Sequence, residues 1–214
     1  MSLVGKKFPN LNVDAMNEMG DTFKLNVLEE AVNNKKKVVL FWYPKDFTFV
    51  CPTELHAFQA ALPEFEKRNT IVIGASCDTP EVHFAWLNTE KDNGGIEGVT
   101  YPILADSNRN LSSILGILDI TNETFDEETE TVQVEGDNVT YRATYIIDED
   151  GLVQHESINN MPLGRNVQEY LRLVDALTHV QEKGEVCPAN WEEGKDAMSA
   201  NAKATAEYLA AHAN

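Results

Sequence analysis

The chain has 214 residues, and 43% of them are apolar, which suits one folded domain with an appendage or two small domains. Asp and Glu number 35 against 17 Lys and Arg, so the formal net charge is −18. This balance argues against nucleic acids and anionic membrane surfaces as partners, because proteins bind both through basic side chains.

Predicted strands and helices alternate along the chain. Short, apolar and β-branched runs over 37–43 and 70–76 are typical of buried strands. Between them, apolar residues recur at helical spacing from Leu55 to Phe65. This order predicts a βαβ unit with a right-handed crossover. The other expected elements are helices over 80–87, 110–118 and 167–180 and strands over 100–105 and 152–158.

The segment before the last of these strands is predicted to contain a hairpin. The runs 131–134 and 139–147 flank a turn-like sequence over 135–138, which favours two strands paired across that turn. The stretch 121–137 is rich in acidic residues, and we expect it to be a solvated loop.

The C-terminal part differs in composition. After Gly184, small and polar residues dominate, and an alanine-rich segment over 200–213 favours a helix. We therefore expect residues 1–183 to form one domain and residues 184–214 to form an arm. An arm that projects from the core can pack on a neighbouring subunit.

Cys51 is the first candidate for chemistry. A predicted strand ends at Tyr43, a loop follows, and Pro52 favours the start of a helix at the cysteine. A cysteine at a helix N-terminus lies beside unpaired N–H groups and the positive end of the helix dipole, which stabilise a thiolate. Because the thiolate is the nucleophile, this position predicts a reactive thiol, with a structural cysteine as the alternative.

Cys187 is the second candidate. Val186-Cys187-Pro188 repeats Val50-Cys51-Pro52 near the other end of the chain, which suggests one thiol that attacks and one that resolves. Their separation excludes a Cys-x-x-Cys dithiol. A disulfide between them requires either that the tail folds back or that a partner chain supplies the second cysteine. The third cysteine, Cys77, is interpreted as structural.

The active-site region carries a family resemblance. Pro44-x-x-x-Thr48-x-x-Cys51, within Asp-Phe-Thr-Phe-Val-Cys-Pro-Thr-Glu, resembles the motif of typical two-cysteine peroxiredoxins, a family that includes the peroxidase subunit of alkyl hydroperoxide reductase. The resemblance implies an α/β, thioredoxin-like fold with a mixed central sheet flanked by helices and a C-terminal arm. Three further segments match in the same order, namely 142–148, 162–165 and 185–191.

The resemblance implies a role for each residue of the motif. Cys51 attacks peroxide and becomes a sulfenic acid, which condenses with Cys187 of a partner subunit. Thr48 offers a hydroxyl to the peroxide oxygens. Pro44 packs over the cysteine and limits the access of water.

Two arginines and a glutamate complete the predicted site. Arg142 remains charged and offers several donors, so it can stabilise the thiolate and contact a peroxide oxygen. Glu54, one helical turn after Cys51, is expected to hold Arg142 or Arg165. For both arginines the alternative is a purely structural ion pair.

The resemblance also implies the reaction and its partners. The expected function is a thiol-dependent peroxidase that reduces hydrogen peroxide and alkyl hydroperoxides. Its disulfide would be reduced again by an external dithiol protein, either thioredoxin-like or a flavoprotein disulfide reductase. The expected assembly is a homodimer, and a decamer of five dimers.

No cofactor or metal is expected. The histidines His56, His155, His179 and His212 show no spacing typical of metal ligands. The chain also lacks a glycine-rich nucleotide fingerprint in the required context. We therefore expect catalysis without metal, flavin or nicotinamide.

A cytoplasmic location is expected. Three cysteines are too few for a secreted disulfide scaffold, and the first ten residues contain no apolar signal core. The longest strongly apolar run is far shorter than the ~20 residues that span a membrane. In this compartment disulfides tend to be catalytic.

Two other classes of function compete with the peroxidase. A redox-controlled holdase chaperone would shield unfolded proteins, and it is compatible with peroxidase activity. A hydrolase would pair Cys51 with a histidine base, either His56 or His83. Turnover of a thioester that requires one of these histidines would favour the hydrolase.

Overall fold

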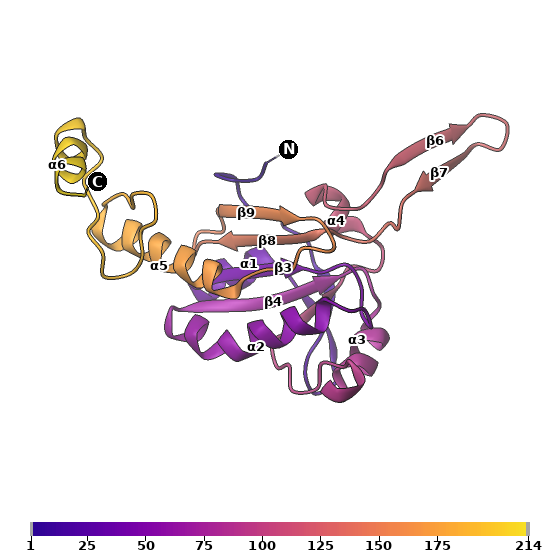
Figure 1. Ribbon diagram of the computed structural model, residues 1–214. Helices are drawn as coiled ribbons and strands as arrows, with labels where there is room; N and C mark the ends of the chain where they lie inside the picture. Colours follow the sequence, from indigo (N-terminus) through magenta and orange to yellow (C-terminus); the bar gives the residue numbers. More distant parts are fainter. Residues whose placement is uncertain (1, 213–214) are drawn as a thin grey trace. The chain divides into compact units, whose positions relative to one another are not determined.

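A computed structural model describes residues 2–212 (Figure 1). The chain divides into two compact units, Met1–Val167 and Gln168–Asn214. The expected domain boundary between 183 and 184 stays a prediction. The division into units falls earlier in the chain, so residues 168–183, which we expected in the first domain, belong to the second unit. Of the alanine-rich segment expected to be helical, Ala213 lies outside the described residues, as does Asn214 after it.

A seven-stranded sheet forms the centre of the first unit. Its strands are β1 (Val13–Met16), β2 (Thr22–Leu25), β3 (Lys37–Trp42), β4 (Thr70–Ser76), β5 (Ile103–Ala105), β8 (Arg142–Ile147) and β9 (Val153–Asn159), in the order β2-β1-β5-β4-β3-β8-β9. The central strands β3, β4 and β5 are parallel, and the outer strands are antiparallel. The predicted mixed sheet is confirmed.

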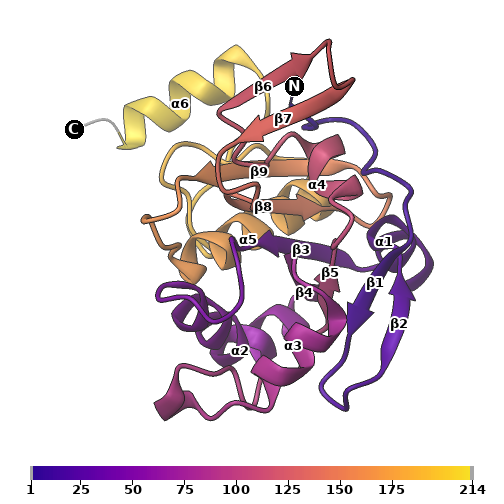
Figure 2. The ribbon, with the colours of Figure 1, turned by 90° about the vertical axis from the view of Figure 1, so that its right-hand side faces the viewer.

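Helices cover both faces of this sheet, and β3 shows how they are sorted. Val38, Leu40 and Trp42 belong to a core cluster that contains side chains of two helices, α1 (Val27–Asn34) and α4 (Asn110–Leu115). The alternate residue Phe41 stacks on Phe58 of α2 (Cys51–Lys67), with 4.0 Å between ring centroids. Because successive side chains of a strand point to opposite faces, α1 and α4 cover one face and α2 covers the other. Figure 2 shows α2 beside α3 (Pro80–Leu87).

Most elements expected from periodicity are confirmed. The strand over 70–76 and the helix over 80–87 have the predicted bounds, and the helix after the loop begins at Cys51. The helix expected over 110–118 ends earlier, at Leu115, because Gly116 adopts a left-handed conformation with φ 67°. Glycine takes this conformation without steric cost, and it commonly terminates helices.

The predicted hairpin across 135–138 is wrong. β6 (Asn122–Asp126) pairs instead with β7 (Thr131–Glu135), and the residues after the expected turn form β8, which pairs with β3 and β9. The Asp126 carboxylate accepts the backbone N–H groups of Glu128 and Thr129, and this turn chemistry closes the hairpin earlier than predicted.

The acidic stretch expected to be a loop is therefore largely this β6–β7 ribbon. The residues of both strands are solvent-exposed except Asp126, which is half-buried. The ribbon projects away from the seven-stranded sheet (Figure 1).

The second unit contains α5 (Val167–Lys183) and α6 (Ala202–His212). Trp191 holds the segment between them: its ring lies 4.9 Å from the His179 ring, and its indole N–H donates to Lys195 O. Arg172 of α5 donates to the Trp191 carbonyl oxygen. These contacts fold the segment that carries Cys187 against its own helix.

The helices are of modest length. The longest, α2 and α5, have 17 residues each, and both contain charged side chains. Over residues 2–212, no helix has the length and apolar character needed to cross a membrane.

Candidate active site

The loop between β3 and α2 delivers Cys51 to the first turn of α2. Val50 is the N-cap and Pro52 lies in the first turn, so the predicted helix start is confirmed. The Thr48 hydroxyl donates to Cys51 Sγ over 2.9 Å, and Arg142 Nη1 lies 3.4 Å from the same sulfur. Cys51 is 0% exposed. Two donors at the N-terminus of a helix make this a setting that stabilises negative charge on sulfur.

Sheet topology brings Arg142 to the cysteine from 91 residues away in sequence. β8 runs antiparallel to β3, with Val38 opposite Ile147 and Phe41 opposite Thr144. The first residue of β8 therefore lies beside the end of β3, where the loop to Cys51 begins. Arg142 Nε also donates to Met161 O over 2.6 Å, which fixes the direction of the guanidinium.

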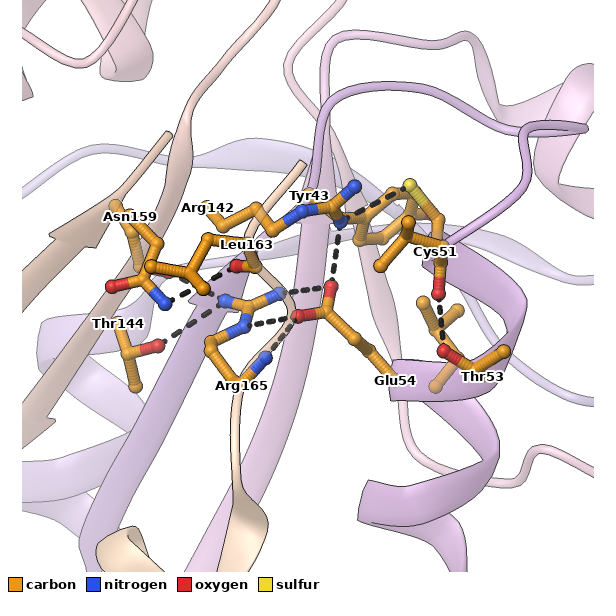
Figure 3. Close-up of polar contacts among 12 residues, drawn as sticks. Tyr43, Cys51, Thr53, Glu54, Arg142, Thr144, Asn159, Leu163 and Arg165 are labelled. Carbon is orange, nitrogen blue, oxygen red and sulfur yellow. Dashed lines mark hydrogen bonds and ion pairs between the residues drawn. The ribbon is translucent and has the colours of Figure 1, made fainter. Parts of the chain in front are cut away.

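Glu54 lies between the two predicted arginines and binds both (Figure 3). Arg142 Nη1 donates to Glu54 Oε2 over 2.7 Å. Arg165 forms a fork, from Nε to Oε1 over 2.9 Å and from Nη2 to Oε2 over 2.8 Å. We expected Glu54 to hold either Arg142 or Arg165. In the structure its carboxylate binds both arginines.

The charges of this cluster leave a place for a thiolate. The side chains of Glu54, Arg142 and Arg165 are each at most 4% exposed. Two guanidinium groups and one carboxylate sum to one uncompensated positive charge, which is costly where water is excluded. An anionic Cys51 would neutralise it.

Arg165 reaches the sulfur through Glu54 and has further partners of its own. Its Nη1 donates to the Ala143 carbonyl over 3.0 Å. Its guanidinium lies 5.1 Å from the centroid of the Phe41 ring and 5.9 Å from that of Phe58. Stacking on aromatic faces and the fork to Glu54 suit arginine and not lysine. Arg165 thereby fixes the carboxylate that in turn orients Arg142.

The stability of the cluster should depend on pH through Glu54. Burial raises the pKa of Glu54, but the hydrogen bonds and charges of Arg165 and the charge of Arg142 outweigh it and hold the pKa below its ordinary value of 4.5. Because the folded-state pKa is lower than the unfolded-state pKa, protons bind preferentially to the unfolded chain. The stabilisation is thus complete above the ordinary carboxyl pKa and disappears as the pH falls through the folded-state value.

We expect Glu54→Gln to destabilise the fold by about 3–5 kcal/mol at pH 7, because two buried guanidinium groups lose their counter-charge. Urea unfolding followed by circular dichroism measures the difference. The deficit relative to wild type should shrink as the pH is lowered below 4.5. Glu66→Gln, at an exposed glutamate of the same helix, is the matched control and should stay near wild type. An equal deficit for both variants would contradict the assignment.

A pocket of about 600 Å³ lies next to the two residues that contact the Cys51 sulfur. Pro44, Thr48 and Arg142 are among its lining residues, and the last two touch Cys51 Sγ. Much of the remaining lining is apolar, from Phe49, Val50, Val139, Met161 and Pro162. Three of the predicted residues, Pro44, Thr48 and Arg142, therefore line a cavity large enough for a small molecule.

The other two cysteines have different surroundings. Burial raises the pKa of Cys77 to about 11, and its sulfur lies 3.6 Å from Ser112 Oγ. Cys187 is partly exposed, and its thiol points to the Ala176 carbonyl of α5 at 3.7 Å. Burial also raises the pKa of Cys187. All three cysteines are free thiols in this structure.

The two histidines weighed as bases face other partners. His56 Nε2 lies 3.0 Å from Gly95 O, and His83 Nδ1 lies 2.7 Å from Asp46 Oδ2. The structure thus gives no support to a Cys–His hydrolase. The sequence does not predict the pairing of His83 with Asp46. Asp46 lies in the loop before α2 and His83 lies in α3, and no periodicity or motif spacing connects the two positions. Among the described residues, no group of three or more His, Cys, Asp or Glu side chains is placed to hold a metal ion.

Family models match both units of the chain. The model described as "AhpC/TSA family" matches residues 4–156. The model described as "C-terminal domain of 1-Cys peroxiredoxin" matches residues 176–211. The first match covers the loop, α2 and β8, which together supply the sulfur and its donors.

Curated relatives span nearly the whole chain. A chloroplastic 2-Cys peroxiredoxin BAS1 of Hordeum vulgare is 38% identical over 211 residues, which are 99% of this chain and 92% of the relative. An alkyl hydroperoxide reductase C of Helicobacter pylori is 40% identical over 210 residues, 97% of this chain and 96% of the relative. Peroxiredoxin-2 of Bos taurus is 40% identical over 209 residues, 98% of this chain and 96% of the relative.

A solved structure has the same architecture. The reduced 2-Cys peroxiredoxin of Plasmodium vivax superposes with a TM-score of 0.86 at 36% sequence identity, covering 98% of this chain and 100% of that one. The predicted thioredoxin-like α/β fold is thereby confirmed.

Proposed function

The chain belongs to the AhpC/TSA family of peroxiredoxins, which are thiol-dependent peroxidases, and from this premise we propose that Cys51 is the cysteine that reduces peroxide. One observation carries the assignment. Cys51 Sγ receives a hydroxyl donor from Thr48 and a guanidinium donor from Arg142, and both donors line the pocket beside it.

In the first step the Cys51 thiolate attacks the terminal oxygen of a hydroperoxide. An S–O bond forms as the O–O bond breaks, so sulfur is oxidised to a sulfenic acid and the peroxide is reduced. The departing oxygen takes a proton and leaves as water or an alcohol. Arg142 and Thr48 stabilise the charge that moves from sulfur to this oxygen, while Pro44 limits water access to sulfur.

In the second step the Cys187 thiol of a partner subunit condenses with the sulfenic acid. An S–S bond forms and water leaves. The match to 2-Cys peroxiredoxins over nearly the whole chain supports this resolving role for Cys187. An external dithiol protein, thioredoxin-like or a flavoprotein disulfide reductase, then returns both cysteines to thiols.

The substrates we propose are hydrogen peroxide and alkyl hydroperoxides. The donors at the sulfur suit the two oxygens that all hydroperoxides share. The apolar part of the pocket, which includes Phe49, Val139 and Pro162, accommodates a small alkyl group. A comparison of second-order rate constants for hydrogen peroxide and tert-butyl hydroperoxide measures how much this lining contributes.

The direct test is a single turnover of reduced protein with one equivalent of hydrogen peroxide, followed by electrophoresis without reductant. The expected result is loss of peroxide together with a disulfide-linked dimer. Unconsumed peroxide would overturn the proposed function.

We expect Cys187→Ser to separate the two steps. The first equivalent of peroxide should disappear at the wild-type rate, because Cys51 and its donors are unchanged. No disulfide-linked dimer should form, and the sulfenic acid should persist long enough to react with dimedone. Mass spectrometry detects the adduct. A cross-linked dimer in this variant would show that a different thiol resolves Cys51.

We also propose a homodimer that assembles into a decamer, in the cytoplasm. An exposed apolar surface supports self-association: Phe47 and Phe49, in the loop that leads to α2, are 53% and 96% exposed. Such a surface marks an interaction site. Sedimentation velocity of the reduced protein measures the assembly.

A further inference from the structure

A buried polar network holds the loop that precedes Cys51. Asp46 lies in this loop between Pro44 and Thr48, and its carboxylate is inaccessible to solvent. The Tyr43 hydroxyl donates to Asp46 Oδ1 over 2.8 Å, and His83 Nδ1 lies 2.7 Å from Asp46 Oδ2. The backbone N–H of Asp46 donates to Asp78 Oδ2 over 2.9 Å. The loop is therefore tied to α3 and to the end of β4.

The partners of His83 define where its protons are. His83 Nε2 lies 3.2 Å from the carbonyl oxygen of Leu104, which can only accept, so this nitrogen carries a hydrogen. At Nδ1 a short hydrogen bond of 2.7 Å joins the ring to the Asp46 carboxyl group. Burial raises the pKa of Asp46, and the His83 hydrogen bond opposes that rise. Because the ring is 0% exposed, water cannot replace either partner.

The backbone next to Asp46 needs such an anchor. Phe47 has a left-handed backbone conformation with φ 55°, which is rare and strained for a bulky residue. A strained backbone conformation persists only where packing or hydrogen bonds of the surrounding structure hold it in place. The ring of Phe47 is half-exposed, so its own packing is incomplete. The bonds to the preceding residue, Asp46, supply the missing constraint.

We propose that His83 is a positioning residue for the peroxide reaction, which acts through Asp46 to hold Thr48 at the Cys51 sulfur. The proposal rests on the proposed function of Cys51. Thr48 is two residues beyond Asp46, and its hydroxyl must be placed within hydrogen-bond distance of sulfur. Loss of the His83 donor would let the loop relax from its strained form and move this hydroxyl. Misplacement of a reacting group by about 1 Å can lower a rate by about 10²-fold.

Two isosteric amides separate the contacts of His83. Asn places a donor near the position of Nδ1 and retains the bond to Asp46, whereas Gln reaches toward Nε2 and retains the bond to Leu104 O. The measurement is the second-order rate constant for oxidation of Cys51 by hydrogen peroxide in the full-length chain. We expect His83→Asn to stay within about threefold of wild type and His83→Gln to lose about tenfold or more.

A double-mutant cycle with Thr48→Val tests the route of the effect. If His83 acts by placing Thr48, then adding His83→Gln to Thr48→Val, which already lacks the hydroxyl, should lower the rate constant by less than about twofold. A general structural defect would instead lower the rate equally in both backgrounds. Equal rates for His83→Asn and His83→Gln, or additive losses in the cycle, would overturn the proposal. Absence of Cys51 oxidation in the wild-type protein would overturn the proposed function instead.

Discussion

Replacement of Cys51 by serine should lower peroxide reduction by about 10³-fold or more, because a serine hydroxyl is not ionised at neutral pH. The substitution is nearly isosteric, and the donors Thr48 and Arg142 can hydrogen-bond the new oxygen. The fold should therefore be retained. Stopped-flow measurement of peroxide consumption, together with a thermal unfolding curve, distinguishes loss of chemistry from loss of structure.

Cys77 provides the matched control for this experiment. Burial raises its pKa to about 11, so it is a neutral thiol at physiological pH and cannot take over the reaction. We expect Cys77→Ser to reduce peroxide at the wild-type rate. Retained turnover in Cys51→Ser, or a comparable loss in Cys77→Ser, would place the reactive thiol elsewhere.

Replacement of Arg142 by methionine should lower the rate of Cys51 oxidation by about 10²- to 10³-fold. Loss of one donor that stabilises developing charge has an effect of this size in other enzymes. Methionine keeps most of the apolar stem, and Glu54 keeps its fork to Arg165, so the fold should survive. Rate constants from competition with a reference peroxidase for limiting hydrogen peroxide measure the effect.

Two further variants define what Arg142 contributes. Arg142→Lys keeps the charge but cannot serve Met161 O, Glu54 and the sulfur with one planar fork, so its rate should lie between wild type and Arg142→Met. Arg68→Met removes an arginine at the far end of α2 and should have little effect. If Arg142→Met reacted as fast as Arg68→Met, the guanidinium would have no role at the sulfur.

Local sequence signals predicted the parts of the fold that depend on a single segment. The apolar runs gave β3 and β4, and the helical spacing gave α2. The motif gave Pro44, Thr48 and Cys51, which are close in sequence and remain close in space. In each case the feature depends on residues that are close in sequence, so the sequence pattern was sufficient to predict it.

Features that depend on strand order were not accessible in this way. The hairpin was misplaced because two β-prone runs with a turn between them do not reveal which other strand each will join. The double pairing of Glu54 requires β8 and the 162–165 segment to meet α2, which only the register of the sheet determines. The hydrogen bond between Asp46 and His83 joins a loop to a helix, and no periodic pattern in the sequence indicates it.

The β6–β7 ribbon has a consequence for the behaviour of the protein in concentrated solution. A two-stranded sheet has two free edges, each of which can template a strand from another molecule. One face of the ribbon exposes Phe125, Val132 and Val134, with Phe125 opposite Val132.

Between residues 121 and 141 the chain carries acidic side chains and no lysine or arginine. Mutual repulsion of these carboxylates keeps the ribbons of neighbouring molecules apart. Acidification or high salt weakens that barrier, so the colloidal stability of the protein is governed in part by an element outside its catalytic fold.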